Sequence, residues 1–474
     1  MNRSTSKAIW WIRRDMRLTD NPALLLAKKK GLVVHPVFVL DPKILNNYPE
    51  DNPRLDFMLN SLRSLSNSIE SCGGQLSVHY GNPIELLPRI LASSGADEVL
   101  AQYDPGSYSR SRDAEVAKIL PLTMTPGLSI TNPDEVLAGN GNSYKIFSPY
   151  YRAWMPKALI EITKADESLN IGRFTNSGES SLLGSFPTRL NKNFPASEIE
   201  ANRRLSLFFS NAESGSMLSN YNSYKDRLDM TATSQMSPYL RFGLISPRLM
   251  AKKATEILRT DASTFTGATS WISELAWRDF YISKTHHFLS SKKIERSDSS
   301  EYFPWRYDTE QYEKWCAGQT GIPIIDAIMR QLCSEGWISN RARMVTASFL
   351  TKQLLIDWRW GSDWFMKKLI DGDPFANSGG WQWVAGVGVG SAPYFRIFNP
   401  VLQAKKYDPH GEYVRRWVPE LASIQSQNIH EPWLLNEQNR KNSDSENYPS
   451  PIVDLNAARD RALSVYKTTR GNNR

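Results

Sequence analysis

The first 130 residues alternate between short apolar runs and longer amphipathic stretches. The apolar runs contain β-branched side chains and lie at residues 9–12, 32–40, 75–80 and 98–103. Such runs are typical of buried strands, and the stretches between them, such as residues 54–69 and 84–91, have helical periodicity. Because strands that alternate with helices build parallel sheets, we predict an α/β domain with a doubly wound parallel sheet over residues 1–130.

Residues 131–200 have a different composition, rich in Asn, Pro, Gly and Ser. This composition indicates a long connection between domains. We expect Tyr150, Tyr151 and Trp154 to hold this linker to the protein surface.

From about residue 198 the pattern is helical and remains so almost to the end of the chain. We therefore predict a larger all-α domain over residues 201–466, with its last helix at residues 457–466. Residues 467–474 are expected to form a frayed tail.

Residues 321–399 concentrate tryptophans, arginines and aspartates in fewer than eighty positions. A first helix is predicted to end at Gly336, with further helices at residues 338–355 and 363–370. Asp371-Gly372-Asp373 and Asn377 follow. A buried charge requires a partner, so this many polar groups among core aromatics predict a polar ligand, such as a flat, partly charged cofactor.

The charge and hydropathy of the chain narrow the class of protein. A hydrophobic fraction of 41% with 22% charged residues is typical of a soluble globular protein. No apolar run approaches the roughly 20 residues of a membrane span, and the N-terminus lacks the apolar core of a signal peptide. We expect a cytoplasmic protein without membrane contact. The net charge of +8 suits a nucleic acid, although a solvated basic surface explains the charge equally well until aromatic side chains share a cleft with it.

Cysteine and histidine usage argues against disulfides and metals. The three cysteines, Cys72, Cys316 and Cys333, lie far apart in the chain. The adjacent His286 and His287 are expected to face different sides of a helix. We therefore predict no metal site.

Four strings in the chain resemble those of the photolyase/cryptochrome flavoproteins. They are TSQMSPYLRFG (233–243), ELAWRDFY (274–281), WISNRARMVTASFLTKQLLIDWR (337–359) and DGDPFANSGGWQW (371–383). The resemblance extends from Trp10 to about Tyr466. Within the family it is strongest to class I or class III DNA photolyases, which repair cyclobutane pyrimidine dimers. It implies an N-terminal α/β domain followed by a helical domain that binds FAD, and it places Arg13–Leu18 in domain packing.

The resemblance assigns a set of residues to FAD, which is reduced in the active state. Arg343 and Asp371 are expected to form a buried pair against the flavin ring, and Asn377 to face its N5 atom. The other expected contacts are Tyr221, Thr233, Ser234, Gln235, Met236, Ser237, Trp271, Arg278, Asn340, Gly372 and Asp373. Without the resemblance, the TSQMS segment would be interpreted as an ordinary helix cap. The pair of Arg343 and Asp371 would be interpreted as a structural salt bridge.

Three tryptophans match the electron-transfer chain of the family. Trp381, Trp358 and Trp305 are expected to carry an electron between the flavin and the protein surface. In a chain with 15 tryptophans, three chosen blind would be core packing, so only the match to the family pattern supports this role.

A further set matches the lesion pocket and the DNA contacts. Glu274, Trp277, Asn340, Met344 and Trp383 are expected to contact a dimer that has flipped out of the helix, because an enzyme cannot reach a base inside the duplex stack. Glu274 is expected to stabilise the dimer radical anion. Phosphate contacts are expected from Lys225, Arg278, Arg341, Gln403 and Lys406. The SNRARM string is similar to that of enzymes that act on double-stranded DNA.

The resemblance therefore implies an enzyme, a lyase that breaks the carbon–carbon bonds of the dimer by light-driven electron transfer. We expect a monomer that binds UV-damaged DNA and, in a prokaryote, associates with the nucleoid. Tyr108-Ser109 replace the Asn-Glu pair of members with a folate antenna, which argues against folate and leaves a deazaflavin, a second flavin or no antenna open. The alternatives are a blue-light receptor of the cryptochrome type and a flavin-free nucleic-acid-binding protein.

Overall fold

The computed structural model describes most of the chain and divides it into two compact units. The described residues are 6–46, 48, 52–167, 173–176, 182–210, 216–260, 262–290, 303–387, 396–435 and 444–471. Unit 1 comprises Met1–Asn222 and Ser234–Ile294, and unit 2 comprises Ser223–Thr233 and Glu295–Arg474. The predicted fold class, an α/β domain followed by a helical domain, is confirmed, whereas the predicted bounds at 1–130, 131–200 and 201–466 stay a prediction.

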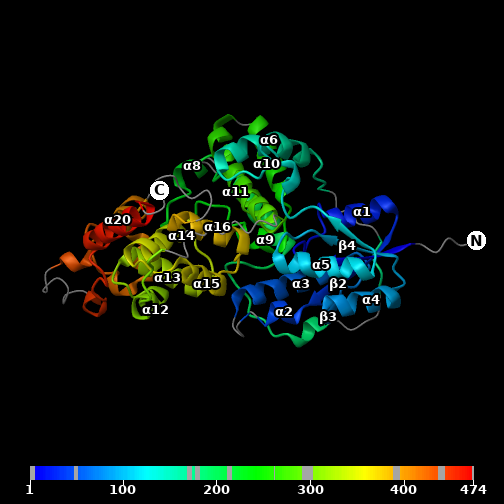
Figure 1. The fold of residues 1–474 in the computed structure, drawn as a ribbon, viewed down its shortest axis with the longest axis horizontal. Helices are drawn as coiled ribbons and strands as arrows, with labels where there is room; N and C mark the ends of the chain where they lie inside the picture. Colours follow the sequence, from blue (N-terminus) through cyan, green and yellow to red (C-terminus); the bar gives the residue numbers. More distant parts are fainter. Residues whose placement is uncertain are drawn as a thin grey trace, which may run out of the picture. The chain divides into compact units, whose positions relative to one another are not determined.

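Unit 1 begins with the predicted parallel sheet. Its five strands pair in the order β3-β2-β1-β4-β5, and every pair is parallel (Figure 1). The strands are β1 (Lys7–Ile12), β2 (Val33–Leu40), β3 (Ser77–Tyr80), β4 (Glu98–Gln102) and β5 (Leu122–Thr125). The sequence pattern identified the first four strands but missed β5, because LTMT is short, contains two threonines and is only partly buried.

Side chains alternate between the two faces of the sheet, and helices cover both faces. Ile9 and Trp11 of β1 pack with Val99 of β4 and with residues of α4 (Pro83–Ser94) and α5 (Ser107–Ile119) in one core cluster. Right-handed crossovers place α1 (Pro22–Lys30) and α3 (Pro53–Ser71) on the other face. The short α2 (Pro42–Leu45) follows β2.

The predicted linker contains a long, partly buried helix that the sequence pattern did not reveal. Helix α6 (Phe147–Thr163) buries Tyr150, Trp154, Ala158 and Ile162, which recur every four residues. Pro156 lies inside α6, and the flanking Asn- and Gly-rich segments hid the periodicity. Tyr150 and Trp154 therefore belong to the core of unit 1 and do not attach a linker to its surface.

Four more α-helices of the described residues lie in unit 1. They are α7 (Glu198–Phe209), α9 (Ser237–Phe242), α10 (Pro247–Thr260) and α11 (Phe265–Ser290), and the short α8 (Tyr221–Tyr224) begins in unit 1 and ends in unit 2. The buried carboxylate of Asp279 on α11 accepts hydrogen bonds from Trp154 Nε1 at 2.9 Å and from the backbone N–H groups of Ile130 and Thr131 at 2.9 and 3.1 Å. Asp279 thereby fixes the start of the segment after β5 to α11. Arg17 donates to the carbonyl of Gly243 at 3.1 Å, so the Arg13–Leu18 segment packs on the end of α9 as predicted.

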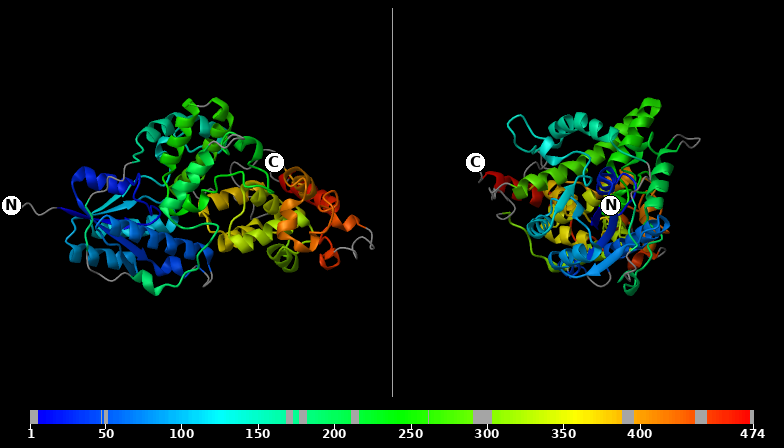
Figure 2. Two further views of the ribbon diagram at one scale, coloured as in Figure 1. Left: turned by 180° about the vertical axis from the view of Figure 1, so that it is seen from behind. Right: turned by 90° about the vertical axis from the view of Figure 1, so that its right-hand side faces the viewer.

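Unit 2 is built from helices around a tryptophan-rich core (Figure 2, yellow to red). The helices are α12 (Thr309–Ala317), α13 (Pro323–Glu335), α14 (Asn340–Ser348), α15 (Trp358–Lys368), α16 (Pro374–Ala385), α17 (Pro400–Tyr407), α18 (Glu412–Trp417) and α20 (Leu455–Gly471). Gly336 ends α13 in the left-handed conformation, as predicted.

Three predicted helix boundaries in unit 2 were wrong. The stretch predicted as one helix at 338–355 is α14 followed by a π-helical turn, Phe349–Gln353. Helix α15 begins five residues before the predicted start at 363, because Asp357 caps it by accepting from the backbone N–H of Arg359. Helix α20 extends to Gly471, so the residues from 467 to 471 continue the helix instead of fraying. Among the described residues, no helix combines the length and the apolar character that a membrane crossing requires.

Candidate functional site

Arg343 and Asp371 form the predicted ion pair in unit 2. Arg343 lies on the first turns of α14, and its Nη2 donates to Asp371 Oδ2 at 2.7 Å. Its Nε donates to the carbonyl of Ile338 at 3.1 Å, which fixes the plane of the guanidinium. The Asp371 side chain is 1% exposed, whereas that of Arg343 is 28% exposed. The pair therefore has a buried end and an accessible end.

The second oxygen of Asp371 lacks a hydrogen-bond partner in the part of the chain that the structure describes. Oδ1 is buried and makes no hydrogen bond to any described residue. A buried acceptor without a donor costs about 1–3 kcal/mol, so a native protein retains one where a ligand supplies the donor. The N–H groups of a flavin ring fit this requirement, and the planar guanidinium beside it suits a flat, conjugated partner.

The side-chain amide of Asn377 also has only one of its two polar atoms, Nδ2, hydrogen-bonded to described residues. It lies on the first turn of α16, and its Nδ2 donates to Ser362 Oγ at 2.8 Å and to the Ser362 carbonyl at 3.1 Å. The two bonds to α15 orient the amide and leave Oδ1 as the acceptor that points elsewhere. An acceptor held in this way suits a ligand N–H.

Asp373 caps the helix that carries Asn377. It is the N-cap of α16, and its Oδ1 accepts from the backbone N–H groups of Phe375 and Ala376 at 2.9 and 3.2 Å. A cap of this kind stabilises a helix by about 1 kcal/mol. Asp373 therefore has a structural role in addition to the predicted cofactor contact, and Gly372 lies between the two aspartates.

The three predicted electron-transfer tryptophans belong to one core cluster. Trp381, Trp358 and Trp305 are 3%, 7% and 7% exposed. Trp381 packs edge-to-face against Phe365 and Trp315, with ring centroids 5.0 and 6.2 Å apart. A Cβ at Gly361 would lie 2.2 Å from the Trp381 ring, so only glycine allows α15 to approach it this closely. Trp358 Nε1 is buried without a partner among the described residues.

Helix α14 also carries the unit 2 part of the predicted lesion and DNA set. Asn340 and Met344 are one turn apart, and the Asn340 amide lies 3.6 Å from the Met344 sulfur. Arg341 makes an ion pair with Asp226 at 2.5 Å and reaches Gln403 Oε1 at 3.5 Å. The Arg341 guanidinium also stacks over the Tyr407 ring at 4.6 Å.

The other predicted DNA residues of unit 2 are more accessible. Lys406, on α17, is exposed, and Lys225 is half-buried. Trp383 is partly buried and packs against the core of this unit.

The unit 1 part of the predicted FAD set centres on the residues before α9. Ser234 Oγ accepts from Trp271 Nε1 at 3.1 Å, which joins this segment to α11. Gln235 has a φ of +51°, a strained conformation for a residue other than glycine that tends to occur at ligand sites. Met236 is buried and Ser237 begins α9. Tyr221 is buried against Phe208.

Glu274, Trp277 and Arg278 lie on one face of α11, at positions i, i+3 and i+4. Trp277 stacks on Phe147, the first residue of α6, with centroids 3.7 Å apart and an interplanar angle of 7°. Arg278 donates to the carbonyls of Leu128 and Leu240. The structure therefore gives Arg278 a role in holding the backbone of unit 1.

The predicted residues thus fall into a set on each unit. The structure brings together Arg343 with Asp371, Asn340 with Met344, and Ser234 with Trp271. The three tryptophans belong to one core cluster. Of the predicted members, Thr233 belongs to the short segment of unit 2 at residues 223–233. Sequence reasoning missed Ser362 and Phe147. Neither belongs to a motif, and only spatial proximity to Asn377 and Trp277 shows what they contact.

The expectation for His286 and His287 was wrong. Their rings meet edge-to-face with centroids 4.8 Å apart. The two side chains turn toward each other because both lie near the end of α11, where the turn of residues 133–135 supplies acceptors to both rings.

Two unsatisfied donors lie at the carboxyl edge of the sheet in unit 1. Arg13 follows β1 and makes an ion pair with Asp113 at 2.5 Å. Its Nε and Nη2 are buried without partners among the described residues. Arg112 stacks over Trp11 at 4.6 Å. The sheet order places Arg13 where β1 meets β4, at the point where the strand order reverses, and α/β sheets commonly bind ligands there.

Comparison with known proteins identifies the family of the chain. The family model for DNA photolyase matches residues 8–168, and the model for the FAD binding domain of DNA photolyase matches residues 271–468. The chain is 37% identical over 485 residues to the deoxyribodipyrimidine photo-lyase of Alkalihalophilus pseudofirmus. The alignment covers 98% of each of the two chains.

Solved structures show the same relationship. The class III photolyase of Agrobacterium tumefaciens superposes with a TM-score of 0.88 at 33% identity over 99% of both chains. An archaeal photolyase from Sulfolobus tokodaii, solved with two FAD molecules, superposes with a TM-score of 0.79 at 28% identity. The match covers 98% of this chain and all of the archaeal chain.

Proposed function

This chain belongs to the DNA photolyase family, and we propose that Arg343, Asp371 and Asn377 hold the FAD with which it splits cyclobutane pyrimidine dimers in light. One observation carries the assignment. Asp371 Oδ1 is a buried acceptor for which no described residue supplies a donor, next to a guanidinium whose orientation Ile338 fixes. The site therefore requires a ligand that brings N–H groups and a flat ring.

The division of labour follows from these contacts. When bound, reduced FAD supplies the photoexcited electron that opens the cyclobutane ring and then returns. Asp371 accepts from the ligand, Arg343 compensates the Asp371 charge, and Asn377 presents its amide oxygen. Ser362 keeps that amide from rotating by accepting both of its protons. On unit 1, Ser234, Gln235 and Trp271 are the proposed cofactor contacts.

Trp381, Trp358 and Trp305 relay electrons through the core of unit 2. An oxidised indole is most acidic at Nε1, and Trp358 Nε1 has no acceptor among the described residues. Trp358 therefore keeps its proton and passes the positive charge on. The measurable consequence is that Trp305→Phe slows light-dependent reduction of the protein and spares repair by protein reduced beforehand.

On unit 1, Trp277 and Glu274 are the proposed contacts of a flipped-out dimer, and Asn340 and Met344 are the proposed contacts on unit 2. The parallel stack on Phe147 holds the Trp277 ring in one plane, so that it is ready to stack on a base without losing rotational freedom on binding. Glu274 lies one turn before Trp277 and supplies a carboxyl group for the polar rim of the dimer. The pocket is selective because flipping costs least for a damaged base pair.

Binding to the DNA backbone is shared among basic residues of unit 2. Lys406 and Lys225 are the proposed phosphate contacts, with Gln403 beside them. Arg341 contributes its charge from the ion pair with Asp226. We propose that a monomer binds duplex DNA without sequence preference, in the cytoplasm or nucleoid.

We propose the carboxyl edge of the sheet in unit 1 for a second chromophore of flavin type. The support is the pair of orphan Arg13 donors, which fit acceptor atoms of a ligand. Tyr108 donates to Asp41 and stacks near Arg112 at 5.5 Å, so the Tyr108 side chain already has partners. An absorption spectrum of the released chromophores, compared between wild type and Arg13→Ala, tests this assignment.

The decisive experiment measures repair. Purified full-length protein, reduced beforehand, is illuminated with a duplex oligonucleotide that contains one thymine dimer. We expect repair by wild type and by Glu256→Ala, which removes an exposed glutamate of α10. Glu274→Ala should lower repair per absorbed photon about 10-fold or more, the order expected on losing one stabilising contact to a developing charge, and should change DNA affinity less.

Two results would contradict the proposal. A protein that purifies without flavin would remove the cofactor assignment. A Glu274→Ala variant that loses DNA affinity but repairs normally once bound would assign Glu274 to binding alone.

A further inference from the structure

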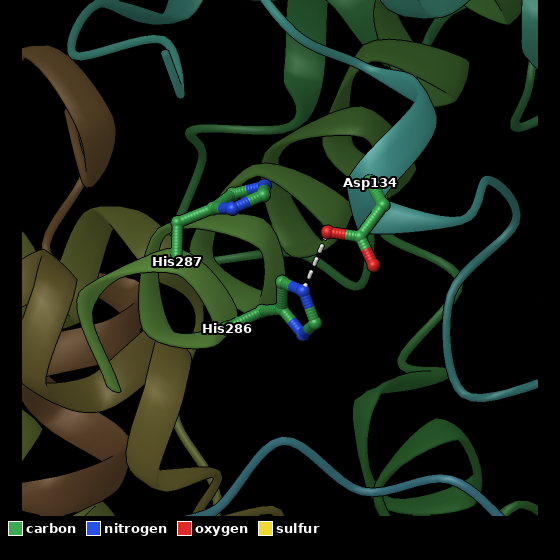
Figure 3. Close-up of side chains that lie close together, drawn as sticks. All are labelled: Asp134, His286 and His287. Carbon is green, nitrogen blue, oxygen red and sulfur yellow. Dashed lines mark hydrogen bonds and ion pairs between the residues drawn. The ribbon is translucent and has the colours of Figure 1, made fainter. Parts of the chain in front are cut away.

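Asp134, His286 and His287 form a cluster of potential metal ligands in unit 1, outside the proposed flavin and lesion residues (Figure 3). One ligand atom from each residue can be chosen so that all three lie within 4.8 Å of one another. His286 Nε2 lies 2.8 Å from Asp134 Oδ1. Asp134 belongs to the turn η1 (Pro133–Glu135), whereas the histidines lie near the end of α11.

Each imidazole already has an outer partner on one ring nitrogen. His286 Nδ1 lies 2.8 Å from the Tyr103 hydroxyl, and His287 Nε2 lies 3.1 Å from the carbonyl of Pro133. With protons on these two nitrogens, His286 Nε2 and His287 Nδ1 keep their lone pairs. Metal-binding histidines usually donate their second N–H in this way, which fixes the tautomer and orients the ring.

Asp134, the third proposed ligand, is exposed to solvent, and its carboxylate can rotate. The Asp134 side chain is 63% exposed, and that of His286 is 12% exposed. Two ligands at about 2.0 Å from a tetrahedral zinc ion lie roughly 3.3 Å apart. A small rotation of the Asp134 carboxylate away from His286 would open the 2.8 Å contact to this separation. The backbone of Asp134 is held meanwhile by Asn132 Oδ1, which accepts from the Asp134 N–H at 3.2 Å.

We propose that Asp134, His286 and His287 bind a divalent transition-metal ion, with Zn²⁺ as the ion that the ligand set fits best. Two imidazoles and one carboxylate suit zinc, and water completes a four-coordinate site. Magnesium and calcium prefer sites made of oxygen ligands. The ion joins the segment after β5 to the end of α11, and Tyr103, which follows β4, supports it from outside.

The chain offers matched controls for a binding experiment. The full-length protein with its flavin, without an affinity tag and stripped with a chelator, is titrated with ZnCl₂. Binding is followed by calorimetry and by the zinc content after dialysis. His287→Ala and Asp134→Asn each remove one ligand. Glu135→Gln changes the neighbouring exposed acid, and His410→Ala removes an exposed histidine of unit 2.

We expect about one zinc ion per chain in wild type, Glu135→Gln and His410→Ala. Both ligand variants should bind zinc more than 10-fold more weakly, and Tyr103→Phe roughly 10-fold more weakly through loss of its outer contact. Unchanged flavin content and circular dichroism show that the variants fold. The proposal is overturned if wild type binds no zinc at 100-fold molar excess, or if His287→Ala and Asp134→Asn bind it as wild type does.

Discussion

Two buried aspartates of unit 2 differ in how their oxygens are satisfied. Asp326 accepts four hydrogen bonds, from Thr320 N at 2.7 Å, Thr320 Oγ1 at 2.6 Å, Gly321 N at 3.0 Å and Tyr448 OH at 2.5 Å. Asp371 accepts one, from Arg343, and its other oxygen has no partner among the described residues. Both carboxylates are less than 5% exposed. Burial and residue type are therefore equal, and only the completeness of the hydrogen bonding differs.

This difference separates a structural group from a binding group. A complete set of donors means that the fold itself uses the carboxylate, because removing it would strand every donor at once. An incomplete set of donors means that the fold tolerates the free-energy cost of an unsatisfied buried oxygen. A ligand that donates a hydrogen bond to this oxygen removes the cost. Asn377, with its Nδ2 occupied and its Oδ1 available, follows the pattern of Asp371.

The largest effect is expected from Asp326→Ala. Loss of the carboxylate leaves two backbone N–H groups and two hydroxyls buried without an acceptor, so the free energy of unfolding should fall by about 3–4 kcal/mol. Asp371→Ala in flavin-free protein should change it by less than about 1 kcal/mol. Urea unfolding followed by tryptophan fluorescence measures both. Equal losses in the two variants would break the distinction between the two aspartates.

The second prediction concerns flavin affinity. Asp371→Asn keeps the shape of the side chain but removes the charge, so the dissociation constant for FAD should rise about 10- to 100-fold, equivalent to roughly 1.4–2.8 kcal/mol. Asp363→Asn, an exposed neighbour on α15, provides the control. Flavin fluorescence on reconstitution of the stripped protein gives both constants, and an unchanged affinity in Asp371→Asn would remove the aspartate from the cofactor site.

The sequence predicted the Arg343–Asp371 ion pair but not the partners that orient the side chains of the proposed site, and the reason is physical. Arg343, Asp371 and Asn377 lie in strings whose chemistry resembles that of a known family, and local order is enough to identify them. The partners that orient them come from elsewhere in the chain. Asp226 is 115 residues from Arg341, and Ser362 comes from a different helix than Asn377. No periodicity encodes such contacts.

The prediction of strands and helices from the sequence was limited in a similar way. Four strands followed from short runs with apolar and β-branched residues. Strand β5 did not, because its pairing with β4 and not its composition makes it a strand. Helix α6 was missed because Pro156 and the polar flanks outweighed a regular four-residue spacing of buried side chains. The His286–His287 contact was missed because helical geometry alone separates neighbours, whereas acceptors from the turn at residues 133–135 draw both rings together.

The third prediction uses pH to probe Asp326 alone. Burial raises the pKa of Asp326 to about 6 from an ordinary value of 3.8, although Thr320 and Tyr448 oppose the shift. The folded protein thus takes up this proton more readily than the unfolded chain, and the stabilisation is present at low pH and lost as pH rises through about 6. The Tyr448 hydroxyl can reverse its role and accept from the protonated carboxyl.

The stability difference between wild type and Asp326→Ala should therefore be about 1 kcal/mol larger at pH 5 than at pH 7, since one pKa unit corresponds to about 1.4 kcal/mol. Urea unfolding at the two pH values measures it. A difference that is smaller at pH 5 would mean that the hydrogen bonds outweigh burial and that Asp326 is ionised in the folded protein at both values.

The smallest effect is expected from Ser362→Ala. This variant tests whether flavin binding by the Asn377 amide requires the hydrogen bonds between Asn377 Nδ2 and Ser362. The variant removes the acceptor at 2.8 Å from Asn377 Nδ2 but keeps the carbonyl at 3.1 Å, so the amide stays hydrogen-bonded and gains freedom to rotate. FAD affinity should fall only about 2- to 3-fold, or roughly 0.5 kcal/mol. Ser378→Ala, which removes the acceptor of Gln382 on the same helix, should leave the affinity unchanged. If Ser362→Ala lowers the affinity as much as Asp371→Asn does, the orientation of the Asn377 amide contributes as much to flavin binding as the unpaired oxygen of Asp371.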